Sequence, residues 1–357
     1  MKILSIETSC DETAIALLDI NGPLERPNIK ILGNSLFSQV AIHEQYGGVY
    51  PMLAKREHQK NLPVLLEKTL KEAQIDTQCP PIDFIAVTAG PGLEPALWTG
   101  ITFAEELGER WKKPVVPVNH MEGHIFSVLY GLAKDNPLRL PALALLVSGG
   151  HTELVHIKDF DQYEIIGHTV DDAVGEAFDK VARMLGLPYP GGPKISALAE
   201  KSRFRIKDLG FKFPRPMIHS GNLNFSFSGL KTAVLYKLRA ENRDDDEFKE
   251  NMARAFEDAA IDVLVKKTQT AIESLEGKIH TLIVGGGVAA NAYLNQKLND
   301  FIKDFPEITL CLPERPLTTD NAVMIGIAAY VNITTNPTLL NNTNKIVANG
   351  NLKVSSR

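Results

Sequence analysis

Apolar positions in the first third of the chain form three short β-type runs, over residues 2–6, 13–20 and 29–35. Leucines then recur at three- and four-residue intervals within residues 51–73, which predicts an amphipathic helix. Two further strands, at 84–88 and 115–118, alternate with helices that end near residues 111 and 133. The predicted order of elements is β-β-β-α-β-α-β-α.

The same order begins again after residue 140. Three strands are predicted at residues 142–147, 153–157 and 163–168. A long, mostly helical region, 171–276, takes the place of the first helix. A strand at 281–284, a helix at 289–301, a strand at 308–312 and a helix at 319–331 complete the second copy.

A duplicated three-stranded meander with crossover helices is typical of the actin-like, sugar-kinase and Hsp70 class, whose ribonuclease H-like α/β domains face each other across a nucleotide cleft. Two unrelated α/β domains are the alternative. The predicted domains are 1–138 and 139–335, with an insertion at about 171–276 in the second. The tail 336–357 is rich in Asn and Thr, and we expect it to be loop or loosely packed.

Composition narrows the class of protein further. The chain has 357 residues, of which 44% are hydrophobic and 23% charged, and its net charge is -5. These values fit two globular domains and exclude fibrous and wholly disordered classes. No apolar run approaches the roughly 18 residues of a membrane span. Acidic residues near the N-terminus and three widely spaced cysteines favour a cytoplasmic protein.

Candidate chemistry lies in the loops that follow matched strands, because ligands of open α/β sheets bind at the carboxyl ends of strands. One such loop is residues 7–13 and its counterpart is 148–152, where Gly149 and Gly150 would admit an anion; a plain turn is the alternative. Three glycines at 285–287 precede a helix, an arrangement that suits a phosphate or an adenosine. Asn291 would then be free to bind a base edge or a ribose hydroxyl.

Two histidines, His120 and His124, stand at i and i+4 on one predicted helix face, as a divalent metal requires. The duplication places Asp320 at the matching helix start of the second copy. Two imidazoles and one carboxylate favour Fe(II), then Zn(II). A helix cap and a buried polar histidine are the alternative for the pair. The metalloprotease pattern is absent, because Glu122 does not directly follow the first histidine.

Several segments resemble the bacterial TsaD family, the tRNA adenosine threonylcarbamoyltransferases, from residue 3 to about 331. They are IETSCDET at 6–13, HMEGH at 120–124, LLVSGGHT at 145–152, GEAFDK at 175–180, YPGGP at 189–193, FSFSGLK at 225–231 and GGGVAAN at 285–291. The resemblance implies transfer of a threonylcarbamoyl group from L-threonylcarbamoyl-adenylate to the exocyclic amine of the adenosine next to the anticodon. The tRNAs concerned read codons that start with A, and AMP is released.

The resemblance also assigns residues. It implies a metal held by His120, His124 and Asp320. It implies that the donor is held by Leu146, Val147, Ser148, Gly149, Gly150, Asp179, Gly192 and Asn291. Many members have an aspartate three residues after the proline of Gly-Gly-Pro, where this chain has Ser196, which can hydrogen-bond a hydroxyl but carries no charge. We further hypothesise that Asp11 or Glu12 takes the proton that the attacking amine loses, or orients the donor.

Partners follow from the same resemblance: tRNA, a TsaB-like paralogue and a TsaE-like P-loop ATPase, with no membrane. The helix at 51–73 is a candidate helical interface, although its leucines also fit a core-facing stripe. Residues 201–216 contain six Lys or Arg and one Asp, a local charge of +5, interleaved with three phenylalanines. Such a segment could bind RNA, and a solvated rim with core phenylalanines is the alternative.

Two other functions compete with the transferase. The first is an ATP-dependent small-molecule kinase or ATPase of the same fold. That class usually places Asp-x-Gly in its first hairpin, where this chain has Glu7, Thr8 and Ser9. The second is a metallopeptidase, which the position of Glu122 disfavours.

Overall fold

Strands and helices follow the predicted order twice in the computed structural model, which describes residues 1–133, 136–205, 209–241, 243–341 and 345–354. The first copy consists of β1 (Lys2–Glu7), β2 (Glu12–Asn21), β3 (Asn28–Ser38), α1 (Val40–His43), η1 (Glu44–Tyr46), α2 (Pro51–Glu72), β4 (Phe84–Gly90), α3 (Glu94–Trp111), β5 (Val115–Asn119), α4 (His120–Phe126) and η2 (Ser127–Gly131). The single helix expected to reach residue 133 is therefore a short α-helix followed by a 3-10 turn.

The second copy repeats this plan with a helical insertion. It consists of β6 (Ala142–Val147), β7 (Thr152–Asp159), β8 (Gln162–His168), α5 (Val174–Met184), α6 (Gly191–Phe204), α7 (Ser228–Glu241), α8 (Asp246–Ser274), β9 (Thr281–Gly285), η3 (Gly287–Ala290), α9 (Ala292–Phe301), η4 (Ile302–Asp304), β10 (Thr309–Cys311), η5 (Arg315–Leu317), α10 (Ala322–Thr335) and η6 (Pro337–Asn341).

The two sheets have the same strand order. It is β3-β2-β1-β4-β5 in the first sheet and β8-β7-β6-β9-β10 in the second. In each, the first two strands pair antiparallel, and the central strand pairs parallel with the strand that follows the first crossover. Matching topology confirms the prediction of two duplicated α/β domains of the actin-like type.

The chain divides into two units that do not follow the predicted boundaries. The first unit contains Met1–Arg139, Lys158–Tyr163 and Pro313–Arg357, and the second contains Leu140–Ile157 and Glu164–Leu312. Residues 313–335, assigned from the sequence to the second domain, thus lie in the first unit. The reason is α10, an almost wholly apolar helix that packs against β1, β2 and α4.

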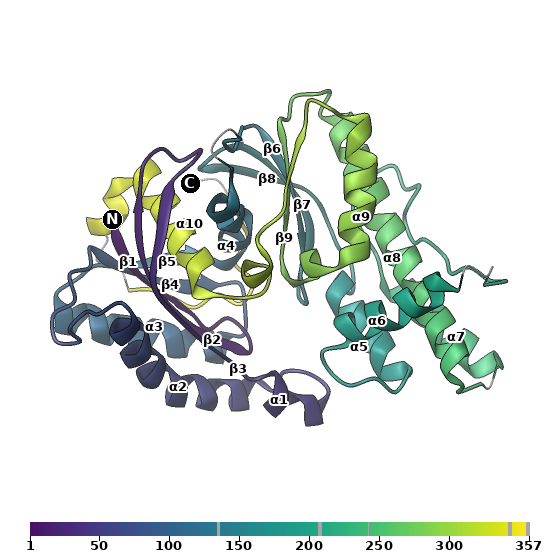
Figure 1. Ribbon diagram of the computed structural model, residues 1–357, viewed down its shortest axis with the longest axis horizontal. Helices are drawn as coiled ribbons and strands as arrows, with labels where there is room; N and C mark the ends of the chain where they lie inside the picture. The colour runs from purple at the N-terminus through teal and green to yellow at the C-terminus, as the bar shows by residue number, and fades with distance from the viewer. Residues whose placement is uncertain (134–135, 206–208, 242, 342–344, 355–357) are drawn as a thin grey trace. The chain divides into compact units, whose positions relative to one another are not determined.

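In the first unit, helices cover both faces of the sheet (Figure 1). Helices α2 and α3 cover one face, where the leucines of α2 join the core, so the core-facing interpretation of that stripe is confirmed. Helices α10 and α4 lie on the other face. In the second unit, α5 to α9 and the sheet share one apolar core.

Beyond η6 the described residues of the tail are loop, as expected, but several of them are firmly packed. Ile346, Ala348 and Val354 are buried, and the first two pack into the core of the first unit. The backbone of Asn349 donates a hydrogen bond to Ala89, and further bonds join the tail to the β4–α3 loop. The sequence did not predict this packing, because the few apolar residues of the tail lie among asparagines.

Candidate functional site

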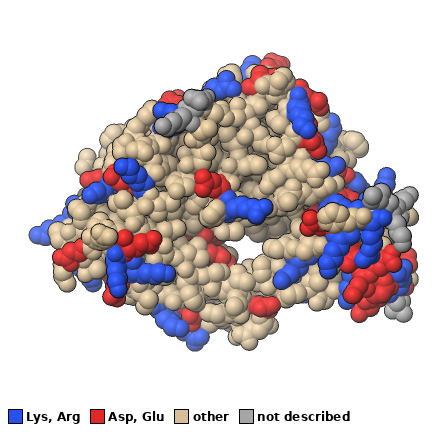
Figure 2. All heavy atoms as spheres, in the orientation of Figure 1, with Lys and Arg blue, Asp and Glu red and all other residues tan. Residues whose placement is uncertain are grey.

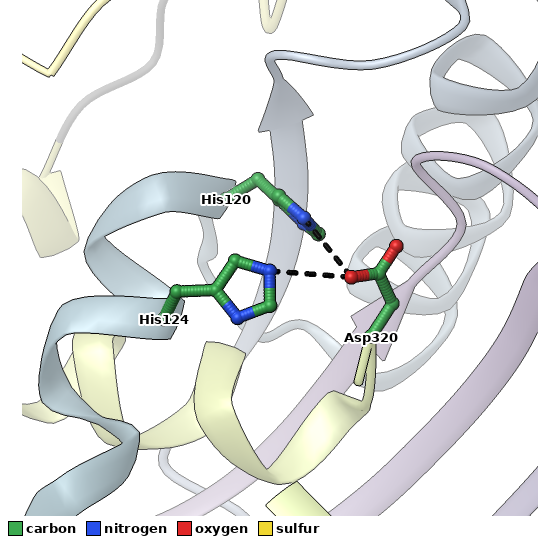
Figure 3. Close-up of side chains that lie close together, drawn as sticks. All are labelled: His120, His124 and Asp320. Atoms are coloured by element: carbon green, nitrogen blue, oxygen red, sulfur yellow. Dashed lines mark ion pairs between the residues drawn. The ribbon is translucent and has the colours of Figure 1, made fainter. Parts of the chain in front are cut away.

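The two histidines and the aspartate predicted to bind metal lie together in the first unit (Figure 3). Asn119 caps α4 through its side chain, which accepts a hydrogen bond from the backbone of Met121 and fixes the start of the helix at His120. The Nε2 atoms of His120 and His124 lie 3.3 and 3.2 Å from Asp320 Oδ1. One ligand atom from each residue falls within 4.8 Å of the others.

Asp320 reaches the histidines because α10 docks beside α4. It stands immediately before Asn321, whose side chain caps α10 by accepting a hydrogen bond from Met324 N. Gly123 permits the close approach of the two helices, since a Cβ there would lie 3.0 Å from Met324 Cγ. The side chain of Glu122 accepts a hydrogen bond of 2.8 Å from Asn332 on α10. Glu122 is thus a structural residue that joins the helices.

Electrostatics in this cluster fit a cation. Burial opposes protonation of His120, but the charges of Asp320 and Glu7 outweigh it and hold the pKa of His120 well above its usual value. Burial lowers the pKa of His124, which keeps its imidazole in the neutral form that ligates metals. Among the described residues, Nδ1 of His124 makes no hydrogen bond, and Nε2 has only the ion-pair approach of Asp320. A bound divalent ion would satisfy this buried imidazole.

A second carboxylate, which sequence reasoning did not assign to the metal site, supports the cluster. Glu7 is fully buried, and its Oε2 lies 3.1 Å from His120 Nδ1. Thr88 Oγ1 donates to the same oxygen at 2.6 Å, and Ser9 N donates to Oε1 at 2.5 Å. Carboxylates behind metal-bound histidines fix the ring and its tautomer. The one signal in the sequence is an acidic residue that directly ends the first strand.

Two acidic residues, Asp11 and Glu12, are the candidate bases. Asp11 ends the turn between β1 and β2, and Glu12 is the first residue of β2, both in the same unit as the histidine cluster. Burial and the nearby charges of Asp11 and Asp320 raise the pKa of Glu12 to about 10. A carboxyl group that is protonated at neutral pH cannot accept a proton, so Asp11 is the better candidate base.

The predicted donor residues lie in the second unit, at the end of β6, within α5, and at the starts of α6 and α9. Leu146 and Val147 have buried side chains, so only their backbone is available to a ligand. Gly149 and Gly150 are exposed, with open space where side chains would project. Gly286 has φ +93°, and a Cβ there would lie 2.4 Å from Val147 O. That glycine is therefore required by the close approach of the two loops.

Asp179, Gly192 and Ser196 surround the start of α6. Asp179 Oδ1 accepts a hydrogen bond of 2.7 Å from Gly191 N, which ties α5 to α6. Asn291 is not free, contrary to expectation. Its Oδ1 caps α9 by accepting from Leu294 N, and its Nδ2 donates to Ser196 Oγ at 2.9 Å and to Glu257 at 2.8 Å. No pattern in the sequence singled out Glu257, which sits in the middle of α8.

The segment 201–216 differs from the exposed basic surface that its composition predicted. Phe213 is buried and Phe211 packs on the same core, whereas Phe204 is 78% exposed. Lys207 lies outside the described residues. The three arginines pair with acidic residues of α8: Arg203 with Glu257 and Asp258, Arg205 with Glu250, and Arg215 with Asp262. On the face shown in Figure 2, basic and acidic side chains are interspersed.

Duplicated sheets of this topology and a His-His-Asp cluster define a two-domain α/β protein of the actin-like class with a candidate metal site. The crystal structure of T. kodakarensis HypF superposes with a TM-score of 0.60 at 15% identity, over 95% of this chain and 49% of that chain. This chain thus spans about half of HypF, and the likeness shows the fold alone.

A family model described as TsaD, tRNA N6-adenosine threonylcarbamoyltransferase, matches residues 30–327. Curated relatives with that same name, from Thermosipho africanus and Thermosipho melanesiensis, are 44% and 46% identical over 330 residues, which is 92% of this chain and 94% of each relative. The chain belongs to the TsaD family. It is therefore a transferase of tRNA modification, and tRNA is its substrate. Within the described residues, no helix is long and apolar enough to cross a membrane.

Proposed function

We propose that this protein transfers the threonylcarbamoyl group of L-threonylcarbamoyl-adenylate to the exocyclic amine of the adenosine next to the anticodon, in tRNAs that read codons starting with A. The observation that carries this proposal is the high identity to threonylcarbamoyltransferases over almost the whole chain. The amine nitrogen bonds to the carbamoyl carbon while the bond from that carbon to the phosphate oxygen breaks. AMP leaves with the electron pair, and the amine loses one proton.

A divalent metal would be held by His120, His124 and Asp320, with Fe(II) favoured over Zn(II) by two imidazoles and one carboxylate. When bound, it supplies Lewis acidity for the donor carbonyl. Glu7 orients His120 from behind. Asp11 accepts the proton lost by the amine, because the raised pKa of the neighbouring Glu12 disfavours Glu12 as the base.

The donor nucleotide would be held in the second unit. Backbone groups of residues 146–150 approach its phosphate, and the exposed glycines 149 and 150 support this role because they leave the backbone accessible. Asp179, Gly192, Ser196 and Asn291 hold its nucleoside.

Partners are proposed from the family: a TsaB-like paralogue and a TsaE-like ATPase. A groove of about 630 Å³ between α2 and α3, lined in part by Leu62, Trp98 and Phe103, is the candidate surface for the paralogue. We place the protein in the cytoplasm because its substrate is tRNA.

The test is reconstitution. The full chain, the partner proteins, an adenylate-forming enzyme, threonine, bicarbonate, ATP and unmodified tRNA should together give threonylcarbamoyladenosine, detected by mass spectrometry of digested tRNA. The Asp11→Asn variant should slow single-turnover transfer by about 100-fold or more, within the range of general-base catalysis. Absence of the modified nucleoside with wild-type protein would contradict the function, and wild-type rates in Asp11→Asn would remove Asp11 from its role.

A further inference from the structure

A buried carboxylate lies beneath the proposed donor residues of the second unit. Glu257 of α8 has no exposed surface. Its Oε1 accepts hydrogen bonds from Ser196 Oγ at 2.7 Å and from Asn291 Nδ2 at 2.8 Å, and its Oε2 accepts one from Arg203 at 2.6 Å. Burial of a charge is unfavourable unless partners satisfy it, and here α6 and the cap of α9 supply them.

The hydrogen bonds that Ser196 and Asn291 already make determine which of their atoms can still bind a ligand. Both amide hydrogens of Asn291 are used, one on Ser196 and one on Glu257. The hydroxyl hydrogen of Ser196 has two acceptors within the protein, Glu257 Oε1 at 2.7 Å and Gly192 O at 3.1 Å, and the shorter contact is to the carboxylate. What stays available on these two half-buried side chains is oxygen lone pairs. Such a surface accepts hydrogen bonds and therefore suits a ligand that offers hydroxyl donors.

We propose that Glu257 is the positioning residue of the donor site, and that it turns the oxygens of Ser196 and Asn291 toward the ribose hydroxyls of the bound nucleotide. This inference rests on the proposed function, since it takes the donor nucleoside to lie at those two residues. Glu257 touches no ligand itself, because it is fully buried. Its role is to fix which atoms of Ser196 and Asn291 face the nucleotide.

A matched control stands next to it in the sequence. Asp258 also pairs with Arg203, at 2.5 Å, and lies 3.8 Å from Arg254. Arg203 further stacks on Tyr293, with its guanidinium carbon 3.4 Å from the ring centroid. Removing either carboxylate therefore leaves Arg203 one acidic partner and one aromatic partner. Only Glu257 contacts the proposed donor residues through these bonds.

The experiment measures binding of AMP to the full-length protein by calorimetry. Glu257→Gln should weaken AMP about tenfold or more, the value of a charge-assisted hydrogen-bond arrangement, while Asp258→Asn stays within about twofold. Binding of 2′,3′-dideoxy-AMP should be the same in wild type and Glu257→Gln. Inosine 5′-monophosphate should lose as much affinity as AMP, because it keeps the ribose and lacks the 6-amino group.

Moving the negative charge from residue 257 to residue 196 distinguishes a positioning role of Glu257 from a purely structural one. Ser196→Asp alone places a second carboxylate beside Glu257 and should weaken AMP binding by repulsion. The double variant Ser196→Asp with Glu257→Gln restores one negative charge and should recover AMP affinity to within about threefold of wild type. Recovery by moving the charge would not follow from a role in stability alone.

Three results would overturn the inference. They are wild-type AMP affinity in Glu257→Gln, equal losses for AMP and its dideoxy analogue, and no loss for inosine 5′-monophosphate. If wild-type protein transfers the threonylcarbamoyl group while any of these holds, the proposed function stands and only the role of Glu257 fails. If wild-type protein binds no AMP, the proposed donor site fails together with this inference.

Discussion

At the scale of single residues, Glu7 is the group on which the histidine cluster most depends. It is buried, it lies 3.1 Å from His120 Nδ1, and it is held by Thr88 and Ser9. We expect Glu7→Gln to weaken metal affinity by about 10- to 100-fold, because an amide cannot support the imidazole as a carboxylate does. Competition between the protein and a coloured chelator for Zn(II) and Fe(II) measures this directly.

Glu122→Gln is the control for that experiment. Glu122 is equally buried and lies on the helix of the histidines, but it bonds to Asn332. Its variant should change metal affinity by less than about twofold. Equal losses in the two variants would assign the Glu7 effect to general damage of the helix.

The candidate site was only partly predictable at this scale. His120 and His124 follow from helical spacing, and Asp320 follows from the duplication. Glu257 could not be found, because it approaches Ser196 and Asn291 only after α6, α8 and α9 have packed together. For the same reason Asn291 looked free in the sequence, whereas its donors are already used.

At the scale of elements, α10 packs tightly on the first sheet. A Cβ at Gly326 would lie 2.4 Å from Leu18 Cδ1. We expect Gly326→Ala to destabilise the protein by about 1–3 kcal/mol through overpacking, and to weaken metal binding because Asp320 moves with the helix. Denaturant unfolding and the chelator assay measure the two effects.

Gly229→Ala, in helix α7, is the control for this variant. A Cβ at Gly229 would lie 4.0 Å from its nearest neighbouring atom. The control should be neutral or slightly stabilising, because alanine favours helix over glycine. A stable Gly326→Ala protein with full metal affinity would show that α10 adjusts without moving Asp320.

Helix α2 supports the loop of Asp11 through a buried histidine. His58 Nε2 lies 3.0 Å from Cys10 O, and Nδ1 lies 2.8 Å from Thr13 Oγ1. Burial lowers the pKa of His58 below its usual value of 6.5. As pH falls below 6.5, the unfolded chain takes up a proton that the folded chain resists, so stability falls, by up to about 1.4 kcal/mol per pH unit until the folded pKa is reached.

The measurement is the free energy of unfolding at pH 7.5 and pH 5.5. His58→Gln should lose part of this pH dependence, because glutamine does not titrate and can still donate to Cys10 O. An unchanged difference between the two pH values would mean that His58 contributes nothing to it.

At the scale of the whole molecule, the tail is an integral part of the first unit. Ile346 is buried against its core, and the next residue, Val347, is 62% exposed. We expect Ile346→Ala to lower stability by about 2 kcal/mol, whereas Val347→Ala stays within about 0.5 kcal/mol. Thermal unfolding of the two variants compares them, and equal melting temperatures would contradict the packing of the tail.

Hydrophobic periodicity was enough to predict the order of strands and helices in both copies, and hence the fold class. It could not predict which sheet α10 covers, because a helix that is apolar all round carries no directional signal. The acidic partners of Arg203, Arg205 and Arg215 were equally hidden, since they lie on α8, far along the chain.

Docking of α10 on the first unit has a consequence for synthesis. His120 and His124 precede the second unit in the chain, whereas Asp320 follows all of it. During synthesis the two histidines are therefore made before the carboxylate. An ion bound by all three residues would join segments from distant parts of the sequence, which would stabilise the folded protein by restricting its unfolded state.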